Sequence, residues 1–320
     1  MSTDLPGRFA LNGATMGTRW STVFYAARVN DALVGIDLQA AVDAVDATMS
    51  TWKADSALMQ FNRAPLGAWL AMPAPLCALV ALALQIGSAS GGAFDIGVGA
   101  AVEAWGFGAS GNLPDSAAIS QLSALSAVGA IEVDLEMSRM RRHSAVQLDL
   151  SGIAKGFGVD RLAETLQSYG ITDFVVSIAG EMRMSGTKPG GSGWMIGLET
   201  PQREHRTLAR TIEVSDLAMA TSGDYRHWRD HEGSVVSHTI DPRTGQPLQS
   251  ALCAVTVTAE HCAVADAWAT ALMVLGQDKG LAKAEQLGLD ALFTLRRKGA
   301  FEEIGVGAFA PTPVTLQQGS

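Results

Sequence analysis

The stretch Leu148–Asp160, which reads LDLSGIAKGFGVD, constrains the fold more than any other part of the chain. Alternating apolar residues over 145–150 predict a strand, and Ser151-Gly152 ends it. Apolar side chains then recur at helical spacing, which predicts a helix over 154–169 that stops at Gly170. The sequence therefore predicts a strand, a glycine turn and a helix in immediate succession.

The turn carries groups that suit a bound anion and a metal ion. A glycine at a strand-to-helix turn lets another molecule approach the backbone closely. The helix start leaves backbone N–H groups available to an anion, and Lys155 adds a positive charge there. Asp149 places a carboxylate in the same region. We interpret the stretch as a phosphate and metal site; the alternative is a capped helix beside a solvated lysine.

The composition of the whole chain excludes several functions. Apolar residues make up 48% of the 320 residues, enough for a sizeable core, and the net charge of −9 argues against general binding of nucleic acids or anionic membranes. The most apolar window, 76–86, is far too short to span a membrane. The three cysteines form no C-x-x-C pair, and the N-terminus shows no signal peptide. We therefore expect a cytoplasmic protein without a membrane anchor.

Predicted strands and helices alternate along the chain without a regular β-α-β repeat. Helices are predicted over 38–49, 74–90, 116–127, 264–275 and 281–286. Further strands are predicted over 18–28, 130–133, 138–142, 173–178, 181–186, 194–199, 211–214, 253–259, 291–296 and 301–304. This order predicts an α+β fold in which helices pack on mixed or antiparallel sheets.

A second candidate site lies in the predicted helix over 264–275. Asp266 and Thr270 are four residues apart, so their side chains share one helical face. A carboxylate and a hydroxyl are hard oxygen ligands of the kind that Mg²⁺ prefers. The alternative is an aspartate that stabilises the helix dipole and a threonine that bonds back to a carbonyl.

A third candidate site contains a histidine between two turns. Thr221 and Ser222 belong to a turn with two hydroxyls, and His238 stands three residues before Asp241. A Ser/His/Asp hydrolase is disfavoured because Ser222 lacks the G-x-S-x-G elbow. His238 is a candidate general base or phosphate contact; the alternative is a hydrogen-bonded histidine at a strand end.

The glycine-rich segment 91–99 matches neither G-x-G-x-x-G after a strand nor a Walker A loop. Such a segment is more consistent with backbone packed against a flat ligand. Trp52 and Trp105 are candidates to flank an aromatic ring, although tryptophans more often belong to the core.

The order of these motifs is specific although each motif alone is weak. They are Met16-Gly17-Thr18, Gly92-Ala93-Phe94-Asp95 with Trp105-Gly106-Phe107-Gly108, Asp149 to Gly156, Thr221 to Tyr225, Ser237 to Gly245, and Ala265-Asp266 with Thr270. In this order, from about 14 to 276, the chain resembles the ApbE family, the FAD:protein FMN transferases. The resemblance implies an ApbE-like, T-fold-like domain over 14–307, with an N-terminal extension over 1–13 and a flexible tail over 308–320.

The resemblance also implies an activity and its site residues. The family binds FAD and Mg²⁺ and moves the FMN half of FAD to a threonine hydroxyl of an acceptor flavoprotein, which leaves AMP. The residues implied for the FAD site are Met16, Trp52, Ala93, Phe94, Asp95, Asp149, Lys155, Thr221 and Ile240. The metal ligands implied are the carbonyl of Gly152 and the side chains of Asp266 and Thr270.

Attack on a pyrophosphate gathers negative charge on the non-bridging oxygens, which Mg²⁺, a lysine and helix N–H groups offset. The acceptor hydroxyl also needs a base, and both His238 and Asp241 are candidates. The same site suits an FAD pyrophosphatase, in which water replaces the threonine. A third possibility is a protein that binds FAD without cleaving it.

Two features depart from the family pattern. Ala179-Gly180-Glu181 stands where the family usually has Gly-Gly-Asp, which changes the backbone room and the reach of the acid. Many members also carry a lipoprotein signal, which this sequence does not show.

Overall fold

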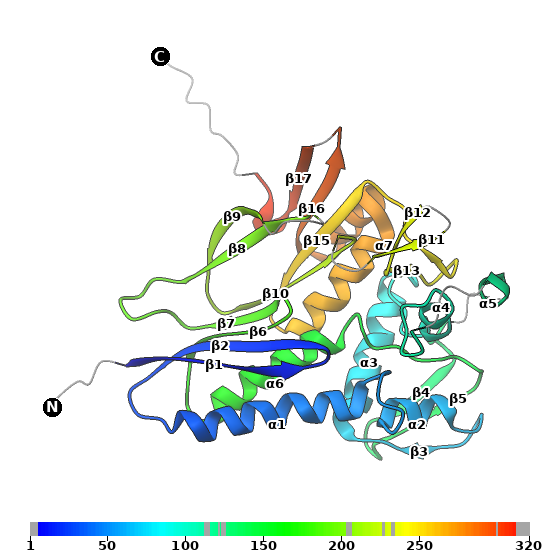
Figure 1. Ribbon diagram of the computed structural model, residues 1–320, viewed down its shortest axis with the longest axis horizontal. Helices are drawn as coiled ribbons and strands as arrows, with labels where there is room; N and C mark the ends of the chain where they lie inside the picture. Colours follow the sequence, from blue (N-terminus) through cyan, green and yellow to red (C-terminus); the bar gives the residue numbers. More distant parts are fainter. Residues whose placement is uncertain are drawn as a thin grey trace.

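A sheet of eight antiparallel strands forms the centre of the fold (Figure 1). The computed structural model describes residues 6–111, 116–120, 122, 126–202, 207–225, 228–231, 234–298 and 300–311. Within these ranges the strand order is β1-β2-β6-β7-β10-β15-β16-β17, and every neighbouring pair is antiparallel. Their bounds are β1 (Gly7–Thr15), β2 (Thr18–Ala26), β6 (Asp173–Ile178), β7 (Glu181–Ser185), β10 (Leu217–Gly223), β15 (Leu252–Ala259), β16 (Asp290–Arg297) and β17 (Ala300–Val306).

Three long helices pack on one face of this sheet. They are α1 (Asp31–Met49), α6 (Ala154–Ser168) and α7 (Cys262–Leu287). Apolar side chains at helical spacing on α1 and α6 meet alternate residues of β2 and β6, among them Phe24 and Phe174, which are fully buried. The side chains of α7 join a second core with β15 and β16. The helices therefore lie side by side under the sheet, which brings the first turns of α6 and α7 together.

The opposite face of the sheet carries a hairpin of β8 (Trp194–Thr200) and β9 (Thr207–Val214). Trp194, Ile196 and Leu198 alternate along β8 and pack on apolar residues of the sheet, including Met184 and Met219. The smaller elements are α2 (Ala57–Arg63), α3 (Ala74–Ala89), α4 (Gly99–Ala104), α5 (Ser116–Ser120), β3 (Leu70–Ala71), β4 (Ile131–Asp134), β5 (Arg139–Arg142), β11 (Trp228–His231), β12 (Ser234–Ser237), β13 (Ile240–Asp241), β14 (Gln246–Pro247) and the 3-10 helix Gly307–Phe309. None of the helices in the described ranges is long and apolar enough to cross a membrane.

The predicted α+β fold with antiparallel sheets and packed helices is confirmed. The predicted break at Gly276 is also present, because this residue has φ 77° and ψ −177° and divides α7 into two helical segments. Residues 7–13, predicted as an extension, instead form most of β1, which pairs with β2 along its whole length. Most of the predicted tail lies outside the described residues. The domain limits 14–307 stay a prediction.

The predicted strand over 145–150 is wrong. This segment has a single bridge, between Gln147 and Val98. At Leu148 the backbone bonds to a side chain: the Leu148 N–H donates to Asn62 Oδ1 at 2.8 Å, and Asn62 Nδ2 donates to the Leu148 carbonyl at 2.9 Å. The neighbouring Gln147 carbonyl and Asp149 N–H bond to the loop backbone at Gly99 and Ile96. The side chains of Val146, Leu148 and Leu150 are buried, which explains the apolar residues at alternate positions. A strand with one buried face would show the same alternation. Of the predicted helix over 116–127, residues 116–120 form α5. Residues 122, 126 and 127 are described and are not helical, and the rest of this range lies outside the described residues.

Candidate active site

A cavity of about 1340 Å³ opens where the first turns of α6 and α7 meet the sheet. The segment 93–98, the end of α1, residues 196–199 and the loop after β12 also line it. The predicted site residues that line it are Met16, Trp52, Ala93, Phe94, Asp95, Asp149, Gly152, Lys155, Thr221, His238, Ile240, Asp266 and Thr270. Asp241 is not among the lining residues. The fold thus brings together predicted residues that are spread over most of the chain.

The turn before α6 is held by backbone hydrogen bonds and by close packing. Asp149 Oδ1 accepts from the Ser151 N–H at 2.7 Å, so the aspartate shapes the turn. Gly152 fits here because a Cβ at this position would lie 3.2 Å from the Phe94 ring and 3.3 Å from Thr270 Oγ1. The backbone of Gly152 therefore approaches the Thr270 hydroxyl closely, as a shared metal site requires.

Lys155 is held between two carboxylates. It pairs with Glu181 of β7, and its Nζ lies 3.9 Å from Asp266 Oδ1. Desolvation lowers the pKa of Lys155, but the charges of Asp266 and Glu181 outweigh it, so the pKa stands above its ordinary value. The ammonium is thus charged and half-buried at the cavity wall, which rules out the solvated lysine of the alternative interpretation.

The start of α6 is less open to an anion than the sequence predicts. The Gly156 N–H, in the first turn, donates to Asp266 Oδ2 at 2.9 Å. A protein carboxylate therefore already takes one of the N–H groups that a phosphate would use. The Ala154 N–H also donates to a protein oxygen, the Leu150 carbonyl, at 2.8 Å, so the positive charge offered to a ligand at this point comes mainly from Lys155.

Burial disfavours the ionised form of the Asp266 carboxyl group. Desolvation raises its pKa to about 6; Lys155 opposes this rise, and Glu181 adds to it. Two buried carboxylates thus surround one ammonium, and Glu181 Oε2 is buried without a hydrogen-bond partner among the described residues. A cation placed here would relieve both the excess negative charge and the unpaired oxygen.

The donor set fits Mg²⁺ better than a softer metal. Asp266 and Thr270 project from one face of α7 toward the turn at Gly152, and the Thr270 hydroxyl lies 3.0 Å from Ser222 Oγ. One carboxylate, one hydroxyl and one carbonyl are hard oxygen ligands that leave positions for water or phosphate. Within the described ranges, no three His, Cys, Asp or Glu side chains are grouped to hold a metal. The residues present therefore fit an open magnesium site.

The two candidate bases lie in different surroundings. His238 follows β12, lines the cavity and meets the Phe107 ring edge-on, with 6.4 Å between ring centroids. The Asp241 carboxylate is bound by Arg243, with Nε to Oδ1 at 2.9 Å and Nη2 to Oδ2 at 2.7 Å. Only His238 of the two is placed to take a proton from a group inside the cavity.

The remaining predicted residues have distinct surroundings. Trp52 lines the cavity and is 67% exposed. Trp105 does not line the cavity; its Nε1 donates to the Gly245 carbonyl at 2.8 Å in a small core, so its candidate role beside an aromatic ring is wrong. Asp95 is buried and accepts from Gly97 and Ala127 N–H groups, which fixes the loop on which Phe94 stands.

Sequence reasoning missed the part of the wall that the sheet contributes. Thr256 of β15 and Thr294 of β16 line the cavity, and Thr256 Oγ1 lies 2.8 Å from Thr221 Oγ1. The signal was present: Thr alternates with Val along CAVTVTA, which indicates a strand with one polar face in the interior.

Ala179, which replaces the first glycine of the family's Gly-Gly-Asp, adopts a left-handed backbone conformation. Ala179 has φ 54° and Gly180 has φ 122°, so the turn between β6 and β7 uses left-handed backbone that glycine adopts without strain. The turn nevertheless keeps its shape and delivers Glu181 to Lys155. The longer acid therefore reaches the cavity in spite of the alanine.

Comparison with known proteins places this site in a family. A sequence model of the ApbE family matches residues 16–293. The FAD:protein FMN transferase of Vibrio cholerae is 34% identical over 305 residues, which are 94% of this chain and 91% of that protein. The corresponding protein of Escherichia coli K12 is 32% identical over 90% of this chain and 84% of its own length.

Solved structures agree with the sequence relatives. The flavin transferase ApbE from Vibrio cholerae superposes with a TM-score of 0.85 at 31% identity, covering 95% of this chain and 98% of that one. The apo flavinyl transferase ApbE of Pseudomonas stutzeri also gives 0.85, at 34% identity over 96% and 97% of the two chains. From the match along nearly its whole length, the chain belongs to the ApbE family.

Proposed function

We propose that this protein transfers the FMN moiety of FAD to a threonine hydroxyl of an acceptor flavoprotein in a Mg²⁺-dependent reaction that releases AMP. The observation that carries the proposal is the single cavity in which Lys155, Asp266, Thr270 and His238 meet. Its volume of about 1340 Å³ is ample for a dinucleotide, since small-molecule sites commonly measure roughly 300–1,000 Å³. The names of the relatives support the same activity.

The reaction forms one bond and breaks one. The threonine oxygen attacks the phosphorus on the FMN side of the pyrophosphate, the bond to the AMP oxygen breaks, and FMN becomes joined to the acceptor. His238 takes the hydroxyl proton, and AMP leaves with the electron pair of the broken bond. Lys155 stabilises charge on the phosphate oxygens.

The metal would be held by Asp266, Thr270 and the Gly152 carbonyl, where it supplies positive charge to the non-bridging oxygens. Phe94 and Trp52 provide aromatic surface for the flavin ring, and Asp149 and Thr221 offer polar contacts.

Two other activities would use the same cavity. An FAD pyrophosphatase lets water replace the threonine, and a flavin-binding protein holds FAD intact. Incubation with FAD and Mg²⁺, with and without co-expressed flavoproteins, separates the three. The transferase gives AMP only with an acceptor, together with an FMN adduct on threonine by mass spectrometry. Rapid AMP release without an acceptor supports the pyrophosphatase, and no AMP under any condition supports the binding protein.

Lys155→Ala is expected to weaken FAD binding about ten- to a hundredfold, because a charge-assisted hydrogen bond to the ligand is lost. The loss also leaves Glu181 and Asp266 facing each other without a cation. Flavin fluorescence titration measures the affinity. Lys279→Ala is the matched control, since Lys279 is an exposed lysine of α7. An unchanged FAD affinity in folded Lys155→Ala protein would remove Lys155 from the proposed site.

We also propose a cytoplasmic location. Cys77, Cys253 and Cys262 are free and buried, a pattern typical of a reducing compartment. Burial raises the pKa of Cys253 to about 11 and that of Cys262 well above its ordinary value, so neither thiol is readily oxidised. Cell fractionation with an antibody tests this location. Recovery of the protein from the periplasm or the membrane would contradict it.

A further inference from the structure

Two sets of charged contacts join β7, α6 and α7 side by side. In the first set, Glu181 of β7 and Asp266 of α7 flank Lys155 of α6 at the cavity wall. In the second set the signs are reversed: Asp160 of α6 is flanked by Arg183 of β7 and by the start of α7. We call the second set the Asp160 latch.

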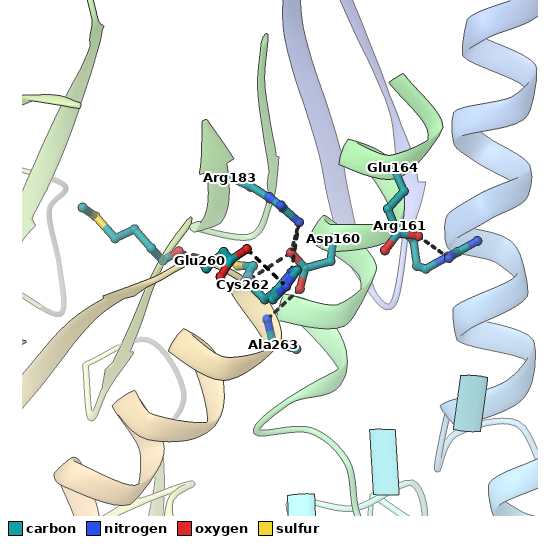
Figure 2. A network of polar contacts seen from close by, with 9 residues as sticks. Asp160, Arg161, Glu164, Arg183, Glu260, Cys262 and Ala263 are labelled. Atoms are coloured by element: carbon teal, nitrogen blue, oxygen red, sulfur yellow. Dashed lines mark hydrogen bonds and ion pairs between the residues drawn. The ribbon is translucent and has the colours of Figure 1, made fainter. Parts of the chain in front are cut away.

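In the Asp160 latch, both oxygens of a buried carboxylate accept hydrogen bonds (Figure 2). Asp160 Oδ1 accepts from Arg183 Nη1 and from the Cys262 N–H, each at 2.9 Å, and Oδ2 accepts from the Ala263 N–H at 2.9 Å. The residue is 5% exposed. Such a carboxylate, fully bonded and paired with an arginine, is strongly held in one orientation.

The start of α7 depends on this carboxylate. His261 occupies the N-cap position of α7 but makes no side-chain capping bond. The first two N–H groups of the helix are satisfied by Asp160, which comes from another helix. The negative charge also faces the positive end of the α7 dipole. Asp160 therefore supplies the cap that α7 lacks in its own sequence.

The latch fixes how α6 lies against α7. Gly156 and Asp160 are four residues apart on one face of α6, and both contact the first turns of α7. A Cβ at Gly156 would lie 2.4 Å from the Cys262 carbonyl oxygen, so the two helices touch backbone to backbone. Asp266 and Thr270 stand one and two turns beyond the latched residues of α7, and Gly152 stands in the turn that leads into α6, four residues before Gly156.

We propose that Asp160 is a positioning residue that sets the relative placement of the Gly152 turn and the Asp266–Thr270 face, and thereby the affinity for Mg²⁺. This inference rests on the proposed metal site. Asp160, Arg183, Cys262 and Ala263 do not line the cavity, so the latch acts on the site through the two helices and not by contact with a ligand.

Asp160→Asn tests the latch with little change of shape. The amide keeps one acceptor oxygen, but its NH₂ group faces a donor, and its neutral charge no longer balances Arg183 or the helix start. If the aligned arrangement falls to about a tenth of the population, the apparent Mg²⁺ affinity falls about tenfold. We therefore expect the Mg²⁺ concentration that half-maximally tightens FAD binding to rise about tenfold.

Three readouts separate positioning from general damage. FAD affinity without Mg²⁺ should change less than about twofold, because the latch does not touch the FAD pocket. With an acceptor flavoprotein present, AMP release should return to within about threefold of wild type at saturating Mg²⁺, and near-UV circular dichroism should show a native fold. Glu164→Gln is the matched control: it removes a charge from the same helix, in an exposed pair with Arg161 that points away from the latch (Figure 2).

Arg183→Gln removes the ion pair of the latch from the β7 side. It serves as a second variant if Asp160→Asn does not fold. It should raise the half-saturating Mg²⁺ concentration in the same direction. Equal Mg²⁺ dependence in wild type and in either folded variant would overturn the latch proposal. Loss of FAD affinity in the absence of Mg²⁺ would overturn it as well. A wild-type protein without any Mg²⁺–FAD coupling would instead contradict the metal site of the proposed function.

Discussion

Asp266→Asn is expected to abolish AMP release from FAD and leave the fold intact. Asp266 carries the only formal charge among the three proposed metal ligands, and asparagine keeps its shape. A hydroxyl and a carbonyl alone hold Mg²⁺ weakly, so charge on the phosphate oxygens is no longer offset in the transition state. With an acceptor flavoprotein present, the rate should fall by at least about a hundredfold, measured as AMP by chromatography at saturating FAD and Mg²⁺.

The same variant should be at least as stable as the wild type without metal. The pKa of Asp266 is raised from 3.8 to about 6, so the folded protein disfavours the ionised form. The native state then holds more protons than the unfolded state between these pH values, and the free energy of unfolding falls as pH rises through them. At pH 7 the ionised carboxylate is therefore destabilising, and a neutral amide removes that effect while it still accepts from Gly156.

Asp278→Asn is the matched control, because Asp278 is an exposed aspartate of the same helix. By linkage, the wild type should also show that Mg²⁺ tightens FAD by the factor by which FAD tightens Mg²⁺, and Asp266→Asn should lose this coupling. AMP release by the variant at the wild-type rate would show that Asp266 only caps the Gly156 amide and that the metal site is misplaced.

Local patterns predicted much of the fold. Strand β6 and helix α3 depend on alternation and helical spacing within a few residues, and the structure has them at 173–178 and 74–89. The start of α1 was missed: the helix begins at Asp31, where Asn30 caps it by accepting from the Leu33 N–H. Asparagine is favoured at the N-cap of helices, so Asn30 indicates a helix start at 31. The prediction of a helix from 38 did not use this residue.

Contacts between distant segments set the limit of such reasoning. The segment 145–150 has the apolar alternation of a strand, but Asn62, 86 residues before Leu148, takes the backbone hydrogen bonds of Leu148, and the groups on either side bond to the loop at 96–99. The sequence places Lys155 at a helix start, yet its partners Glu181 and Asp266 follow from packing of β7 and α7 on α6. Asp160 gave no signal at all, because its role depends on an uncapped helix a hundred residues later.

His238→Ala is expected to lower the rate of FMN transfer by roughly 10²–10⁴-fold, the usual contribution of a general base. His238 lines the cavity on the loop between β12 and β13, in contact with Phe107. An imidazole can accept the proton of a hydroxyl near pH 7, whereas both oxygens of the Asp241 carboxylate are already occupied by Arg243. FAD affinity should change far less than the rate, since the ring acts on the acceptor and not on the flavin.

Asp241→Asn tests the other candidate base, because the sequence alone does not decide between His238 and Asp241. Because Arg243 occupies both carboxylate oxygens, this variant should slow transfer less than about tenfold, through a looser loop around His238. Single-turnover formation of the FMN–threonine adduct, followed by mass spectrometry, separates the chemical step from release of AMP. If Asp241→Asn loses the larger share of the rate while His238→Ala remains active, the proton goes to Asp241, and the loop must rearrange to bring this carboxylate into the cavity.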